Sequence, residues 1–167
     1  MAFARRITEI MHEEHMTTLA MIADVEGLLA GGKQHPPDVT AIATRSTLGQ
    51  FAAAIEDEVR KHFAFEEDHL FPRLADSGDA ALGQELIHEH EAILPIGLHL
   101  TALAKRALEE GFSADDWSEF FAQGGEFVAR LQPHVDKEEK ALLPILDEII
   151  DREADFELCE MYTGNNQ

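Results

Sequence analysis

The sequence predicts an all-α protein, folded as an antiparallel, up-down-up-down four-helix bundle with a short C-terminal tail or helix. Three observations lead to this prediction. Apolar residues recur every three or four positions along four segments, as they do on the buried face of a helix. Gly, Pro, Asp and Ser residues separate these segments and leave short connections, which favour antiparallel neighbours. Alternating β-branched runs and hairpin turns are not found.

The length of the chain fits one domain. The 167 residues are 45% hydrophobic, which is enough for a full core. We expect the bundle to occupy residues 1–150. Residues 151–167 are polar, and we expect them to form a C-terminal tail or short helix that packs on the bundle or frays from it.

The first two helices are separated by residues 31–38, which contain Gly31-Gly32 and Pro36-Pro37. Pro37 and Asp38 suit the first turn of the second helix, where the missing N–H of a proline has no cost. The inner positions of the first helix are Ile7, Met11, His15, Ile22 and Leu29. Those of the second helix are Phe51, Ile55, Val59, His62, Glu66 and His69.

The third helix is expected between the turns at residues 76–79 and 110–113, and the fourth helix after them. Ser113 or Asp115 can cap the fourth helix. Prolines at positions 95, 133 and 144 are expected to break or bend these two helices locally. The inner positions of the third helix are Leu86, His90, Ile93, Thr101 and Leu108. Those of the fourth are Phe120, Phe127, Leu131, His134, Glu138, Leu142, Ile145 and Ile149.

Two polar motifs occur twice each, at offsets of 72 and 75 residues. The chain therefore consists of two copies of one unit, and each copy offers a lone His and then a His/Glu pair. The four occurrences are His62-x3-Glu66-Glu67 with His134-x3-Glu138-Glu139, and Glu14-His15 with Glu89-His90.

Six side chains of these motifs interrupt the faces that should be buried. A buried carboxylate without a partner is costly, and metal coordination removes that cost. At about 1.5 Å per residue, all six fall in one layer of an antiparallel bundle. Imidazoles and carboxylates without thiolate suit iron or manganese and accept zinc. We therefore predict a site for two iron ions, with manganese or zinc as substitutes, whose ligands are His15, His62, Glu66, His90, His134 and Glu138.

Each part of this pattern has a simpler explanation when taken alone. A single His-x3-Glu is more often an exposed pair on a helix, and a single buried His is more often a core residue. Duplication on buried faces favours metal ligands. Glu67 and Glu139 lie about 140° around the helix from the motif histidines and are expected to face outward or sideways. The second ring nitrogen of each ligand histidine needs an acceptor, and Glu58 is one candidate for that of His62.

Charge and cysteine content exclude other classes of function. The net charge of −20 disfavours nucleic acid and membrane surfaces as partners. Cys159 is the only cysteine, which excludes an internal disulfide framework or thiolate cluster. No apolar run reaches the roughly 20 residues that span a bilayer, and the first residues contain no apolar signal region. We therefore expect a cytoplasmic protein. The sequence does not predict its oligomeric state.

Together, these motifs resemble the hemerythrin-like (HHE cation-binding) domain over roughly residues 5 to 150. The resemblance implies a left-handed four-helix bundle around an oxo- or hydroxo-bridged di-iron centre, with Glu66 and Glu138 as bridging ligands. Oxygen-carrying hemerythrins place two histidines four apart on the third helix, whereas positions 86 and 94 here are Leu. The set of four His and two Glu is similar to that of iron-centre repair proteins of the nitrosative stress response.

The resemblance implies a non-haem di-iron protein that binds or processes O2, NO or a peroxide. Its role would be oxygen sensing or storage, or the response to oxidative or nitrosative stress, with a redox partner in some of these roles. Binding and enzymatic turnover both stay open at this point. The alternative is an iron-storage or regulatory metal-binding module that acts through a protein partner. A ferritin-like protein is disfavoured, because that bundle uses Glu-x-x-His motifs.

Overall fold

The computed structural model describes residues 2–164, and within this range the chain is almost entirely helical and contains no strand. The predicted all-α class is confirmed. Three stretches of π-helix interrupt the α-helices, at Ala54–Val59, Glu66–Leu70 and Glu138–Leu142. The α-helices are α1 (Arg6–Leu29), α2 (Ile42–Ala53), α3 (Arg60–Phe65), α4 (Phe71–Asp76), α5 (Ala80–Glu110), α6 (Ala114–Lys137), α7 (Leu143–Ile149) and α8 (Arg152–Gly164).

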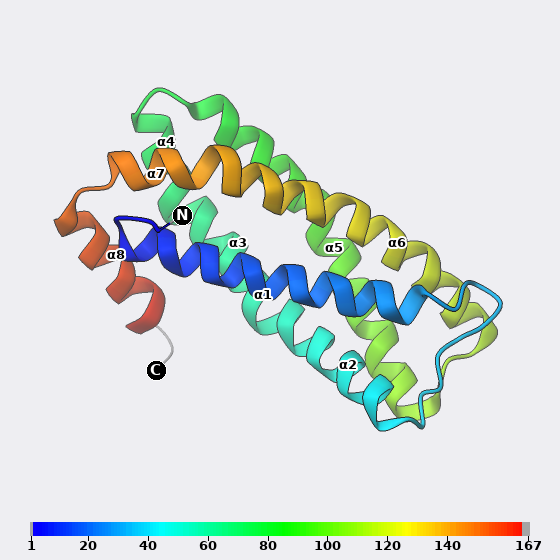
Figure 1. Ribbon diagram of the computed structural model, residues 1–167. Coiled ribbons are helices and arrows are strands. Elements are labelled where there is room, and N and C mark those ends of the chain that lie inside the picture. The colour runs from blue at the N-terminus through cyan, green and yellow to red at the C-terminus, as the bar shows by residue number, and fades with distance from the viewer. Residues whose placement is uncertain (1, 165–167) are drawn as a thin grey trace.

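Four long segments lie side by side in an elongated bundle (Figure 1). The first segment is α1, the second runs from α2 to α4, the third is α5, and the fourth is α6 with α7. The first segment packs against the second and fourth, and the third also packs against the second and fourth. The chain reverses its direction at each connection between segments. After the fourth segment it turns again, and α8 packs against α1.

The helix starts agree with the sequence in one case and differ in another. Ser113 caps α6 as predicted, because its Oγ accepts a hydrogen bond from the backbone N–H of Asp116 at 3.0 Å. The predicted start of the second segment is wrong, since α2 begins at Ile42. Asp38 instead closes a local turn, in which its Oδ1 accepts from the backbone N–H of Thr40 at 2.9 Å.

Of the three prolines expected to break or bend the third and fourth segments, Pro144 lies at an interruption of the α-helix, whereas Pro95 and Pro133 do not. α5 continues through Pro95, and α6 continues through Pro133. Pro144 and its counterpart Pro72 are each the second residue of a new α-helix that directly follows a π-helical stretch. A proline lacks an N–H and clashes with the preceding turn, and a wider π-helical turn accommodates both defects. These two π-helical stretches begin at Glu66 and Glu138.

Two apolar clusters fill the bundle on either side of the layer that holds the predicted ligands. One lies toward the connection at residues 30–41 and contains several large aromatic side chains, including Phe51, Trp117, Phe120 and Phe127. The other lies toward α8 and contains Ile7, Met11, Leu74, Leu146 and Leu158. The polar layer is therefore enclosed by core along the length of the bundle.

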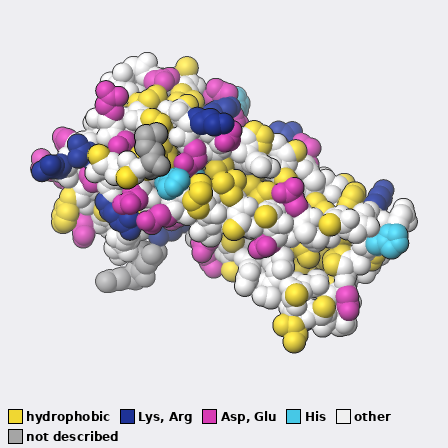
Figure 2. All heavy atoms as spheres, viewed as in Figure 1, with side chains coloured by type: hydrophobic (Ala, Val, Ile, Leu, Met, Phe, Trp, Pro, Cys, Tyr) yellow, Lys and Arg dark blue, Asp and Glu magenta, His cyan; other side chains and the backbone are white. Residues whose placement is uncertain are grey.

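No helix within residues 2–164 is long and apolar enough to cross a membrane. On the face shown in Figure 2, acidic side chains are denser over the end formed by α7 and α8 than over the opposite end.

Candidate metal centre

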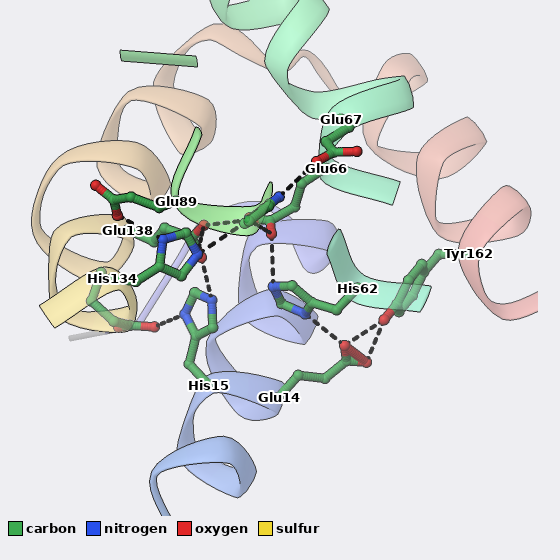
Figure 3. A network of polar contacts seen from close by, with 11 residues as sticks. Glu14, His15, His62, Glu66, Glu67, Glu89, His134, Glu138 and Tyr162 are labelled. Carbon is green, nitrogen blue, oxygen red and sulfur yellow. Dashed lines mark hydrogen bonds and ion pairs between the residues drawn. The ribbon is translucent and has the colours of Figure 1, made fainter. Parts of the chain in front are cut away.

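The structure brings together all six side chains that the sequence predicts as ligands (Figure 3). Each of the four long segments contributes at least one of them. None of the six residues is more than 6% exposed. They are His15 on α1, His62 and Glu66 on the second segment, His90 on α5, and His134 and Glu138 on the fourth segment. Their role as metal ligands stays a prediction that rests on this geometry.

Glu138 lies at the centre of the cluster. Its Oε2 is 2.8 Å from Nε2 of His15, and its Oε1 is 2.9 Å from Nε2 of His134. Nε2 of His90 lies 3.6 Å from Glu138 Oε1 and 3.6 Å from Glu66 Oε1. On the other side of the cluster, Glu66 Oε1 is 3.2 Å from Nε2 of His62. All four imidazoles therefore present Nε2 to the two carboxylates.

The donor atoms separate into two groups that share one carboxylate. In each group one ligand atom per residue lies within 4.8 Å of the others, which is close enough to surround a single cation. The presence of Glu138 in both groups is the arrangement expected of a carboxylate between two neighbouring cations. The groups are His15, His62, Glu66 and Glu138, and His90, His134 and Glu138.

Five buried nitrogen and oxygen atoms in this layer, all of which could bind a metal, make no hydrogen bond within the described part of the chain. A buried polar atom without a partner costs about 1–3 kcal/mol, and more when it is charged. Five such atoms at one place therefore need a shared partner, and cations supply one. The residues thus fit a bound metal. The atoms are His15 Nε2, His62 Nε2, both carboxylate oxygens of Glu66, and Glu138 Oε1.

A second glutamate holds the outer nitrogen of each histidine. For the histidines of the second, third and fourth segments, Nδ1 contacts a carboxylate of the preceding segment. For His15 on the first segment, Nδ1 contacts a carboxylate of the fourth. An Nδ1–H that donates outward keeps Nε2 free to face the centre. The pairs are His62 with Glu14 at 2.8 Å, His90 with Glu67 at 3.0 Å, His134 with Glu89 at 2.8 Å, and His15 with Glu139 at 2.6 Å.

The outer glutamates correct one prediction and refine another. The candidate role of Glu58 as the acceptor for His62 is wrong, because Glu14 of α1 takes that place. Glu67 and Glu139 take the sideways orientation, and each contacts a histidine of the neighbouring segment. The sequence carried a signal for this role, since each outer glutamate is directly next to a predicted ligand and each such pair occurs twice.

Three of the outer glutamates have a further partner. Lys137 Nζ donates to Glu89, and Tyr162 Oη donates to Glu14. His12 Nδ1 lies 2.7 Å from Glu139 Oε2.

Charges within the layer shift the pKa values of its members when metal is absent. Burial alone would lower the pKa of His134, but the charge of Glu138 raises it to about 9. Burial likewise opposes protonation of His62, but Glu66 and Glu14 raise its pKa well above the ordinary value. Burial would raise the pKa of Glu138, but His134 holds it well below its usual range. Protons therefore compete with metal for the imidazoles at neutral pH.

A cavity of about 150 Å³ lies against the centre. His15, His62, His134 and Glu138 line its inner end, whereas His90 does not reach it. Its other walls are mostly small or apolar side chains, and polar residues lie among them. These remaining lining residues are Glu14, Thr17, Thr18, Glu58, Val59, Phe63, Leu131 and Val135.

His90 has a different environment. The ring of Phe63 stacks on it with a centroid distance of 3.7 Å and an interplanar angle of 5°. Leu86 is fully buried in the apolar cluster toward α8, and Leu94 lines a separate surface hollow together with Pro95 and His90 itself. Neither of these leucines borders the cavity at the centre.

Comparison with known proteins gives one match. The family described as "Hemerythrin HHE cation binding domain" matches residues 6–146, which include all six predicted ligands. No curated protein and no solved structure matches the chain.

Proposed function

The chain belongs to the hemerythrin HHE cation-binding family, and from this membership we propose that it is a non-haem di-iron protein that binds or processes O2, NO or a peroxide. The observation that carries the proposal is the group of five buried donor atoms without hydrogen bonds. Residues 1–150 would form the metal-binding bundle, and residues 151–167 its C-terminal addition. Cytoplasmic location and a role in oxygen sensing or stress belong to the same proposal.

Iron is the metal that this donor set favours. Imidazole nitrogens and carboxylate oxygens suit iron and manganese, and zinc can replace them. The one cysteine, Cys159, lies on α8 and is not part of the cluster. Glu66 and Glu138 would bridge the two ions. His15 and His62 would bind one ion, and His90 and His134 the other.

Bound iron would supply redox chemistry and coordination positions for a small ligand. The residues of the chain supply its surroundings. The four outer glutamates hold the imidazole rings in orientation, which maintains both the tautomer and the basicity of each ligand. Val59, Leu131 and Val135 limit the water beside the centre. A cavity of about 150 Å³ has room for a diatomic molecule or a peroxide.

A route from solvent to this cavity lies between α1 and the second segment. Thr17 and Glu58 line the cavity, and both also line a surface groove together with Ala20, Gln50 and Ala54. The π-helical stretch Ala54–Val59 forms one side of this groove. A small neutral molecule would pass here with little hindrance, whereas the carboxylates of Glu14 and Glu58 would repel anions.

Elemental analysis and spectroscopy of the purified, iron-loaded protein test the proposal. We expect about two iron ions per chain, and optical and Mössbauer spectra that change on exposure to O2, NO or peroxide. A reversible change would identify a binding protein, and turnover of the ligand would identify an enzyme. The control is His88→Ala, which alters an exposed histidine near His90 on the same helix. Iron content near zero after reconstitution would refute the proposal. Iron that is bound but inert to all three ligands would favour storage or regulation.

A further inference from the structure

The helix α8 lies beyond the residues that the family model matches, yet it reaches the outer shell of the metal centre. Its residue Tyr162 is 4% exposed and is the only tyrosine in the chain. The hydroxyl of Tyr162 donates to Glu14, with a distance of 2.7 Å to Oε2 and a shorter contact to Oε1. The same Oε1 lies 2.8 Å from Nδ1 of His62 (Figure 3). A short chain of contacts thus connects α8 to a predicted ligand.

Independent contacts fix the position of α8. Asp155 accepts hydrogen bonds from the backbone N–H groups of Arg6 and Ile7, at 2.9 and 2.8 Å, at the start of α1. These N–H groups lack partners inside α1, so the carboxylate stabilises the end of that helix. Leu158 is fully buried in the apolar cluster beside it. The hydroxyl of Tyr162 is therefore held at a defined height beside Glu14.

The ring of Tyr162 is also fixed. It lies 4.6 Å from the ring of Phe65, and Nζ of Lys61 lies 4.2 Å from its centroid. Glu14, in contrast, has a side chain that is 34% exposed. Without the tyrosine hydroxyl, this carboxylate could turn toward water and away from His62.

We propose that Tyr162 is a positioning residue of the metal centre, which fixes the carboxylate of Glu14 and through it the ring of His62. This inference rests on the proposed metal binding. Its consequence is that α8 completes the centre, because the ion held by His15 and His62 depends on a side chain outside the four long segments. A hydrogen bond to Glu14 also withdraws charge from that carboxylate and so sets how strongly His62 donates to the metal.

The first test is Tyr162→Phe, which keeps the ring and removes only the hydroxyl. Titration with Co²⁺, followed by its visible absorption, should show about tenfold weaker binding and a changed spectrum, with the number of ions per chain unchanged. Phe156→Ala is the matched control, because Phe156 lies on the same helix and is 69% exposed; its titration should equal that of the wild type. A structural role alone would lower the melting temperature of the metal-free variant and leave its Co²⁺ affinity and spectrum unchanged, and this result would overturn the inference.

A second test uses the single tyrosine as a probe in the unaltered protein. Labelling tyrosine with ¹³C at Cζ gives one NMR signal, and this signal should move when Zn²⁺ is added. In Glu67→Ala, which removes the outer glutamate of His90 but leaves Glu14 in place, the signal should still move. A signal that stays fixed while Zn²⁺ loads would overturn the role of Tyr162 and leave the proposed function standing. Failure of the wild type to load any metal would instead overturn the proposed function, and this inference with it.

Discussion

The two halves of the metal centre have the same ligands but different surroundings. α1 and the second segment supply His15, His62 and Glu66, and α5 and the fourth segment supply His90, His134 and Glu138. The cavity borders both histidines of the first half. In the second half it reaches His134 only, whereas His90 stacks against Phe63 and lines the separate surface hollow beside Leu94.

The outer partners of the two halves differ as well. In the first half, Glu14 accepts a hydrogen bond from the neutral hydroxyl of Tyr162, and Glu139 contacts His12. In the second half, Glu89 forms an ion pair with Lys137. The repeat in the sequence thus accounts for which residues can bind metal, while the surroundings of the two halves differ. The cavity borders both His15 and His62. We expect small ligands to bind first at the ion held by His15 and His62.

The largest effect is expected from a substitution that abolishes metal binding in both halves. Glu138→Ala deletes the carboxylate shared by the two donor groups, and elemental analysis should show loss of both ions. Glu66→Ala should have the same result, because Glu66 is also proposed to bridge. Full metal occupancy in either variant would contradict the bridged arrangement.

Filling the cavity should slow the binding of small ligands, whereas filling the hollow beside His90 should not. Thr18→Phe places a ring in the cavity, and we expect stopped-flow measurement of NO binding to the reduced protein to show a rate about tenfold to a hundredfold lower. Metal content should be unchanged, because Thr18 is not a ligand. Leu94→Phe fills the hollow beside His90 and serves as the control, with a rate equal to that of the wild type. Equal slowing by both substitutions would show that the cavity is not the route of the ligand.

A smaller effect is expected from the outer glutamate of His90. Glu67→Gln keeps an acceptor for Nδ1 of His90 but removes its negative charge, so metal affinity should fall by no more than about tenfold. Competition with a chelator measures this change. Glu126→Gln is a suitable control, because it alters a surface glutamate on α6 that pairs with Arg130. A complete loss of one ion in Glu67→Gln would show that this residue binds metal directly.

The smallest effect concerns pH. In metal-free protein the pKa of His134 is raised to about 9, so its protonation stabilises the fold fully below about pH 6.5, and this contribution is lost as pH rises through 9. The melting temperature of the metal-free protein should therefore fall by roughly a few degrees between pH 7 and 9. Metal-loaded protein should melt higher and show no such fall, because its imidazoles are already deprotonated. Parallel pH profiles would contradict this account.

The sequence predicts the helical class and the six buried polar side chains well, because both depend on periodicity. His15 and His90 could be placed beside His62 and His134 only because the distance of each residue from the end of its helix can be counted along antiparallel helices. The start of α2 could not be predicted, since Asp38 forms its turn with Thr40 instead of a helical turn. The two π-helical stretches that begin at Glu66 and Glu138 were not apparent either, because they depend on how the proline six residues later packs in three dimensions.

The outer shell was the least predictable part of the centre. Glu14 and Tyr162 are 148 residues apart, and nothing in the local pattern of either residue indicates the other. The contact between Glu14 and His62 also crosses from one segment to the next, and it depends on the rotation of two helices about their own axes. Such rotations follow from packing, which periodicity describes only approximately.

The closed order of the histidine–glutamate contacts has a consequence for the ancestry of the fold. Each segment offers its glutamate to the histidine of the following one, and Glu139 of the last segment returns to His15 of the first. This order is unchanged by a half-turn that exchanges the two sequence repeats, so two copies of a half-length chain, associated about a two-fold axis, would form the same circuit. Tyr162 has no counterpart in the first repeat. Fusion of the halves into one chain therefore permits what a symmetric dimer forbids, namely a different environment for each of the two ions.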